Sequence, residues 1–99
     1  MPLLKIDLQL IACMYDDDRI GSHHGNVENI LKFCTPKDYR DRRSMGQLKK
    51  RLRRLATQGY LIRKTGRYEA YSLSKSGVIA AERWKEGWTL DAISSAEDE

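Results

Sequence analysis

The chain has 99 residues, of which 40% are hydrophobic and 32% are charged. That composition is typical of a globular protein and excludes the disordered and fibrous classes, and the length allows one modest core. No apolar run approaches the roughly 20 residues that cross a bilayer, and residues 1–7 lack the basic and apolar regions of a signal peptide. We therefore expect no membrane contact and a cytoplasmic or nucleoid-associated location.

The net charge of +4 is unevenly distributed along the chain. Residues 37–67 contain twelve Lys or Arg and two Asp, a local charge of +10, whereas the rest of the chain carries −6. A concentrated positive field attracts polyanions. This window is therefore the first candidate for a functional surface.

The cysteines and histidines offer little sign of a metal site. Cys13 and Cys34 lie in apolar segments, which favours buried free thiols over the dense disulfide framework of a secreted mini-protein. We do not expect the fold to need a bond between them. Their spacing to His23 and His24 matches no compact zinc motif. The run Asp16 to Asp18 is explained by a helix end rather than by magnesium, so we expect neither a metal nor a cofactor.

The first element is a helix over Leu3 to Tyr15. Leu4, Leu8, Ile11 and Tyr15 recur at spacings of three and four residues and so share one face. The acidic run after Tyr15 ends the helix.

A short strand and a second helix follow. Arg19 to Ser22 predicts a strand stub with Ile20 inward, before a glycine-rich turn over Gly21 to Gly25. Asn26 is expected to cap a helix of about two turns that Thr35-Pro36 interrupts. Its buried stripe is Val27, Ile30, Leu31 and either Cys34 or Phe33. From Pro36 to Arg43 the boundary stays open, because Thr35 and Pro36 also suit the start of a new helix.

The strongest periodic signal predicts a helix over about Ser44 to Gln58. An apolar seam recurs at spacings of three, four and three residues, and basic residues fill the gaps. The seam is Met45, Leu48, Leu52 and Leu55. Gly59 supplies the left-handed residue that commonly follows a helix end.

A β-hairpin and a last helix complete the expected order. Tyr60 to Arg63 and Tyr68 to Leu73 are rich in aromatic and branched residues and flank the cationic turn Lys64 to Arg67. Ser74 is expected to cap a helix that ends at Gly87 or reaches Trp88. Its apolar face is Val78, Ile79, Ala81 and Trp84. The domain is expected to cover residues 1–93, with residues 94–99 as a loose acidic tail.

The basic helix predicts a surface for duplex DNA. With the seam inward, five residues point outward: Arg43, Gly46, Gln47, Lys50 and Arg54. Arg, Lys, Gln and Ser side chains read bases in the major groove through their donors and acceptors. Gly46 is equally explained by close approach to DNA and by a mild helix defect of about 1 kcal/mol. The hairpin tip is expected to contact phosphates or the minor groove. The candidate DNA-binding residues are Arg42, Arg43, Ser44, Gln47, Lys49, Lys50, Arg51, Arg53, Arg54, Lys64, Thr65 and Arg67.

Two segments carry a resemblance to a known family. The run LKKRLRRLATQGYLIR at 48–63, followed by YSLSKSG at 71–77, resembles the recognition helix, wing and final helix of winged helix-turn-helix regulators, the broad MarR-like and archaeal or phage repressor group. The resemblance covers about half of the chain and implies a mainly α fold with a small β-hairpin. It also implies a dimer in which Ser44, Gln47 and Lys50 read bases and Arg67 lies in the wing. The connection before the helix is longer than the family's usual turn.

Other interpretations remain open. A basic helix face is often only solvated, and a winged helix also serves as a protein or RNA interaction module of a larger complex. No catalytic motif points to an enzyme or a small-molecule substrate. The apolar residues near the chain end are explained either by packing on the core or by a homodimer contact, with paired helices about 34 Å apart on DNA. The candidate dimer residues are Leu4, Leu8, Trp84, Trp88 and Leu90.

Overall fold

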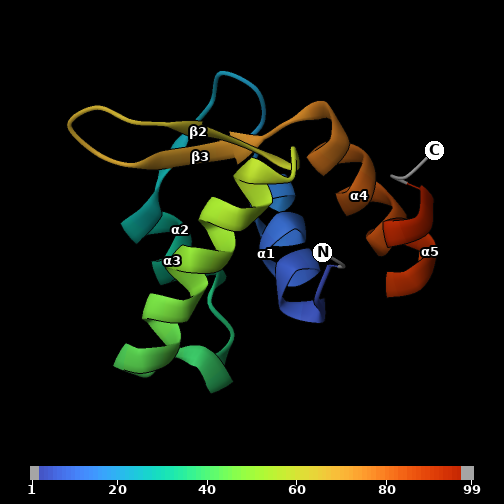
Figure 1. Cartoon of the computed structure of the whole chain (residues 1–99), viewed down its shortest axis with the longest axis horizontal. Helices are drawn as coiled ribbons and strands as arrows, with labels where there is room; N and C mark the ends of the chain where they lie inside the picture. The colour runs from blue at the N-terminus through green and yellow to red at the C-terminus, as the bar shows by residue number, and fades with distance from the viewer. Residues whose placement is uncertain (1–2, 97–99) are drawn as a thin grey trace.

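The computed structural model describes residues 3–96, a mainly helical chain with one small antiparallel sheet (Figure 1). The helices are α1 (Lys5–Asp16), α2 (Val27–Cys34), α3 (Arg42–Thr57), α4 (Lys75–Lys85) and α5 (Leu90–Ala96), with a 3₁₀ turn, η1 (Lys37–Tyr39), between α2 and α3. The strands are β1 (Gly25–Asn26), β2 (Leu61–Lys64) and β3 (Ala70–Leu73), in the order β1-β3-β2. Within residues 3–96 no helix has both the length and the apolar character needed to cross a membrane.

Helix α1 lies at the centre of the molecule, where it contacts α2, α3, α4 and β3. Because neighbours surround it, its buried face is wider than the predicted stripe and comprises Ile6, Asp7, Leu8, Leu10, Ile11 and Met14. The predicted start at Leu3 is wrong, because Leu4 is the N-cap residue and the helix begins at Lys5. The side chain of Leu4 is 47% exposed and does not belong to the core.

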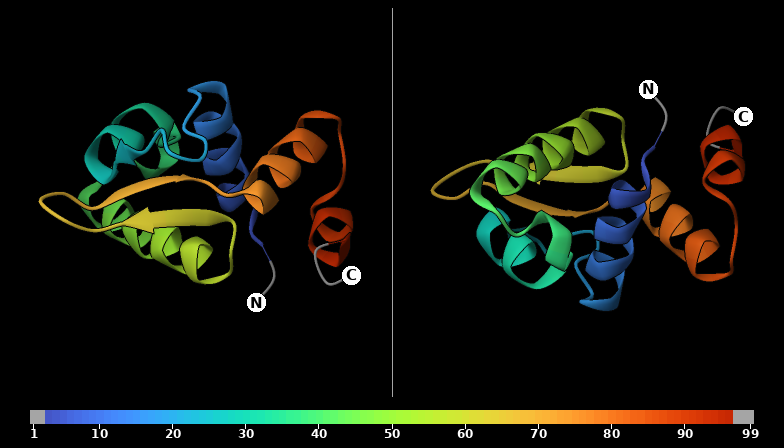
Figure 2. Two further views of the ribbon diagram at one scale, coloured as in Figure 1. Left: turned by 90° about the horizontal axis from the view of Figure 1, so that it is seen from above. Right: turned by 90° about the horizontal axis from the view of Figure 1, so that it is seen from below.

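The predicted hairpin is confirmed, with its first strand shifted by one residue, a shorter second strand and a longer loop. β2 and β3 pair antiparallel from Leu61 opposite Leu73 to Lys64 opposite Ala70, so the loop covers residues 65–69. Figure 2 shows this loop projecting beyond the helices. The predicted strand stub at Arg19 to Ser22 is confirmed only as an isolated parallel bridge between Ile20 and Leu73, and the third strand, β1, lies at Gly25–Asn26. The glycine-rich turn reverses the chain along this edge of β3, because Ile20 pairs with β3 in parallel and β1 pairs with it antiparallel.

Side-chain caps fix the helix starts. The side chain of Asn26 accepts a hydrogen bond from the backbone of Asn29 at 2.8 Å, and the hydroxyl of Ser74 accepts one from Gly77 at 3.2 Å, which confirms both predicted caps. Asp41 caps α3 in the same way, so α3 begins at Arg42, two residues before the predicted start. A side-chain oxygen at the N-cap satisfies a backbone N–H that has no partner within the helix.

The glycines around α3 and α4 have different roles. Gly59 adopts φ +92° directly after the C-cap residue of α3, as its position predicted. Gly77 lies in α4 against the backbone of Tyr60, where an added Cβ would be 2.1 Å from the carbonyl oxygen of Tyr60. A side chain at residue 77 would therefore push α4 away from the start of β2.

A disulfide between Cys13 and Cys34 corrects the prediction of free thiols. The bond joins the last turn of α1 to the last residue of α2. Sequence spacing gave no sign of this pairing, because the contact depends on how the two helices pack. Disulfides are rare in most cytosols, so the bond is a reason to test the expected location.

The C-terminal prediction needs a further correction. Residues 94–96 continue α5 instead of belonging to a loose tail, and Ile93 is fully buried in the core. The apolar side chains of Leu90 and Ile93 hold α5 against the rest of the molecule. The remainder of the predicted tail, residues 97–99, lies outside the described residues.

Candidate nucleic-acid interface

The predicted amphipathic helix is present as α3, and its apolar seam is buried. Leu48, Leu52 and Leu55 are at most 1% exposed, and Met45 packs against the core from its edge. The seam fixes the rotation of α3, because turning the helix would bring leucines into water. The opposite side of α3 therefore faces solvent.

Four exposed residues form a ridge along that outer side, hereafter the α3 ridge: Arg43, Gln47, Lys50 and Arg54. Their spacings of four, three and four residues place them above one another on the helix, over about 16 Å. Among residues 3–96 no carboxylate pairs with Arg43, Lys50 or Arg54. The positive charge of the ridge is therefore uncompensated by the described part of the chain.

Arg51, one of the predicted DNA contacts, is instead held by a buried carboxylate. Its Nε donates to Oδ1 of Asp7 at 2.8 Å, and its second guanidinium nitrogen donates to Oδ2. The hydrogen bond with Asp7 raises the pKa of Arg51. The side chain of Asp7 is fully buried and also accepts from the backbone N–H of Leu4 at 2.7 Å. Arg51 therefore joins α3 to α1 rather than adding free charge.

Arg53 is also paired, with a carboxylate at the base of the hairpin loop. Glu69 accepts from Arg53 Nε at 3.0 Å and from Arg63 Nε at 2.8 Å. The hydrogen bond with Arg53 is the main reason that the pKa of Glu69 lies below its ordinary value. Burial, with help from Glu69, raises the pKa of Tyr71 to about 12. Glu69 therefore fixes the hairpin against α3 and partly compensates the charges of Arg53 and Arg63.

The other predicted contacts on α3 divide into two groups. Arg42 and Lys49 are exposed on the flank of the helix and have no carboxylate partner within residues 3–96. Ser44 is half-buried, and its backbone and side chain both interact with Asp41, whose pKa its side chain lowers. Ser44 therefore belongs to the helix cap.

The hairpin loop adds a second exposed cationic site. Lys64, Thr65 and Arg67 are all exposed, as predicted. Sequence reasoning missed Tyr68, which is 65% exposed and lies under the guanidinium of Arg67, 5.7 Å from it. The sequence signal that could have identified Tyr68 is an aromatic residue directly after Arg67 in a short loop. The face of the ring attracts the guanidinium of Arg67.

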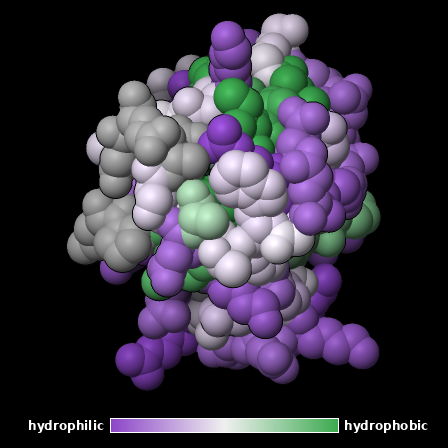
Figure 3. Space-filling model, turned by 90° about the vertical axis from the view of Figure 1, so that its right-hand side faces the viewer, coloured by the Kyte–Doolittle hydropathy of each residue, from purple (hydrophilic) through white to green (hydrophobic). Residues whose placement is uncertain are grey.

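The predicted dimer residues are not all available to a partner. Leu8 is fully buried in the protein's own core and is not available to a partner, which corrects that prediction. Trp84 and Leu90 pack partly against the core, whereas Leu4 and Trp88 are exposed. On the face that includes α4 and α5, apolar areas are small and are separated by polar ones (Figure 3). A homodimer therefore stays a prediction.

The disulfide removes both cysteines from the set of possible metal ligands. Cys13 and Cys34 are bonded to each other, so neither is a thiolate ligand. Within residues 3–96 no three His, Cys, Asp or Glu side chains lie close enough together to hold an ion. His23 instead contacts the carbonyl of Asp18, at 2.6 Å.

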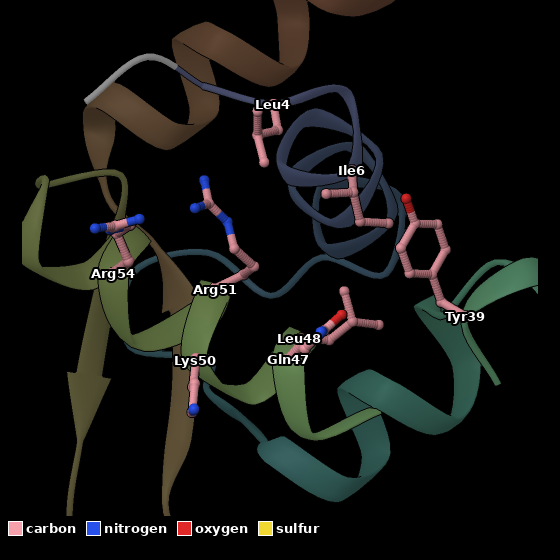
Figure 4. Close-up of a pocket in the computed structure, with 8 residues that line it drawn as sticks. All are labelled: Leu4, Ile6, Tyr39, Gln47, Leu48, Lys50, Arg51 and Arg54. Carbon is pink, nitrogen blue, oxygen red and sulfur yellow. The ribbon is translucent and has the colours of Figure 1, made fainter. Parts of the chain in front are cut away.

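A groove of about 440 Å³ separates α3 from the start of α1 (Figure 4). Its apolar lining comes from Leu4 and Ile6 at the start of α1, from Tyr39 in η1 and from Leu48. Its polar lining is Gln47, Lys50, Arg51 and Arg54. Tyr39 and Ile6 point toward each other at one end, and Arg54 lies at the other. Three members of the α3 ridge thus also border this groove.

Comparison of the chain with models of known protein families, with curated proteins and with solved structures found no match. Any function assigned to this surface therefore depends on its own geometry and chemistry.

Proposed function

We propose that this chain is a winged-helix regulator that binds duplex DNA, with the α3 ridge in the major groove and the β2–β3 loop as the wing. The element order α1, β1, α2, α3, β2, β3 and the sheet order β1-β3-β2 are compatible with that fold. The major groove of B-DNA is about 12 Å wide and admits one α-helix. The ridge is long enough to follow the groove over several base pairs.

The observation that carries the proposal is the uncompensated charge of the α3 ridge. Arg43, Lys50 and Arg54 have no carboxylate partner among residues 3–96, although Asp7 and Glu69 pair with the arginines beside them. Binding to DNA gains from counterion release wherever a cation neutralises a phosphate. Free cations on one exposed ridge suit that role, whereas paired cations would first have to leave their partners.

The hairpin adds to the same surface. Glu69 links the hairpin to α3 through Arg53, so the loop has a fixed direction relative to the helix. The exposed Lys64 at the end of β2 and the exposed Arg67 on the loop are suited to a phosphate chain next to the groove. Gln47, at the middle of the ridge, is suited to pair with adenine through its amide.

Fluorescence anisotropy of a labelled duplex tests the proposal. Lys50→Ala and Arg54→Ala should each weaken binding and lower the slope of log K against log salt by about 1, the loss of one phosphate contact. Lys75→Ala removes an equal charge from the exposed start of α4 and is the matched control. Equal affinities for Lys50→Ala, Arg54→Ala and Lys75→Ala would reject α3 as the DNA-binding helix.

Two further measurements separate neighbouring functions. Structured RNA that displaces the duplex at equal concentration would favour the alternative, an RNA interaction module. Selection from a random duplex pool should yield a preferred sequence for the wild type, and Gln47→Ala should relax it by about 1–3 kcal/mol at one base pair. A pool that stays random for the wild type would remove sequence specificity from the proposal.

A further inference from the structure

We propose that the groove between α1 and α3 binds an alkyl carboxylate, a molecule with one anionic head and an aliphatic chain. The groove volume of about 440 Å³ lies in the range typical of small-molecule sites. Its lining is divided between an apolar part and a cationic part (Figure 4). A ligand that fills it must therefore contain both kinds of group.

The apolar part of the groove suits an aliphatic chain. Ile6 and Leu48 form a floor that is almost fully buried, at 7% and 1% exposure. Leu4 stands beside this floor with about half of its surface in water, although the N-cap position has no need of a leucine. Three of the four apolar lining residues are aliphatic, and a chain laid between them would cover the exposed face of Leu4.

The charged part of the groove suits an anionic head. The charge of Arg51 is already compensated, because the buried carboxylate of Asp7 accepts from two of its nitrogens. Lys50 and Arg54 have no such partner within the described chain, but the amine of Lys50 points away from the groove (Figure 4), so the free positive charge beside a bound ligand is that of Arg54. A carboxylate gains charge-assisted hydrogen bonds there, whereas a neutral polar head gains weaker ones and a cation is repelled.

The site would couple ligand binding to DNA binding, a consequence that rests on the proposed function. Gln47, Lys50 and Arg54 belong both to the groove lining and to the α3 ridge. A carboxylate on Arg54 would occupy a cation that is proposed to bind phosphate. Two anionic ligands that need the same cation exclude each other, so each lowers the affinity for the other.

Amide NMR shifts during titration with octanoate test the site without DNA. Octanoate should give saturable shifts at residues 4–6, 39 and 47–54 of the wild-type protein. Octanamide, with the same chain and no charge, should bind about fivefold more weakly, as expected for the loss of a surface ionic contact. Acetate, with the same head and no chain, should give no saturable shifts at those residues.

Two variants separate the two parts of the groove. Arg54→Gln should weaken octanoate severalfold and leave octanamide unchanged, because only octanoate uses the charge. Leu4→Ala should weaken octanoate and octanamide by the same factor, because both use the chain contact. Lys75→Gln, on α4, is the control and should change neither. Octanoate and octanamide that bind equally, or shifts spread over residues outside the groove, would overturn the proposal.

Adding the labelled duplex distinguishes this inference from the proposed function. Saturating octanoate should lower duplex affinity in the wild type and have a much smaller effect in Arg54→Gln. If octanoate binds in the groove and no duplex binds at all, the proposed function fails and the ligand site stands. If the duplex binds and octanoate gives no saturable shifts, the ligand site fails and the proposed function stands.

Discussion

The ion pair between Asp7 and Arg51 predicts that Asp7→Ala lowers the stability of the wild-type protein but raises the stability of the Arg51→Ala protein. The side chain of Asp7 is fully buried, whereas that of Arg51 is 16% exposed. Arg51→Ala should cost about 3–5 kcal/mol of unfolding free energy, because it leaves a buried carboxylate without its cation. Asp7→Ala in the wild type should cost only about 2 kcal/mol, because Arg51 can turn its head group into the solvent of the groove.

In the Arg51→Ala background the same Asp7→Ala change should raise stability by about 1 kcal/mol, since it removes an uncompensated buried charge. The four proteins of this cycle are the wild type, the two single variants and the double variant. Urea unfolding followed by the helical circular dichroism signal measures the free energy of unfolding of each, provided that the m-values are equal. If Asp7→Ala costs the same in both backgrounds, the two residues are not coupled, and the account of how α1 positions α3 is wrong.

Three further predictions concern stability. Replacing Cys13 and Cys34 by serine should lower the free energy of unfolding by about 3 kcal/mol, because the bond closes a loop with a sequence separation of 21. Urea unfolding with and without reductant checks this, and equal midpoints would contradict it. Gly77→Ala should lower stability by about 3 kcal/mol, because the added methyl group clashes with the backbone of Tyr60. Gly46→Ala, in open space on α3, should raise stability by about 0.5–1 kcal/mol. Thermal melts in which both variants shift the midpoint in the same direction would refute this difference in packing. The pKa of Glu69 lies below its ordinary value of 4.5, so the stability it contributes is present above that value and is lost as pH falls through the lowered pKa. Glu69→Gln should therefore flatten the loss of stability as the pH falls below 4.5, and an unchanged acid profile would remove the role of this carboxylate.

The sequence by itself determined the local elements. Leu48, Leu52 and Leu55 repeat with the period of a helix, and Gly59 follows the helix end, so α3 was predicted within two residues at each end. The caps at Asn26 and Ser74 depend on backbone groups within three residues of each side chain. Such features are readable because the interacting groups are neighbours in the chain. The +10 charge of residues 37–67 was equally a property of sequence alone.

Only the tertiary structure decided which of those charges are free. Asp7 lies 44 residues from Arg51, and Glu69 lies 16 residues from Arg53, so no local pattern shows that these arginines are paired. The packing of α1 likewise decided that Cys13 meets Cys34 and that the start of α1 and α3 enclose a groove. These features follow from distant segments meeting around one core, and a periodic pattern specifies which face of a helix is buried but not against which residue it lies.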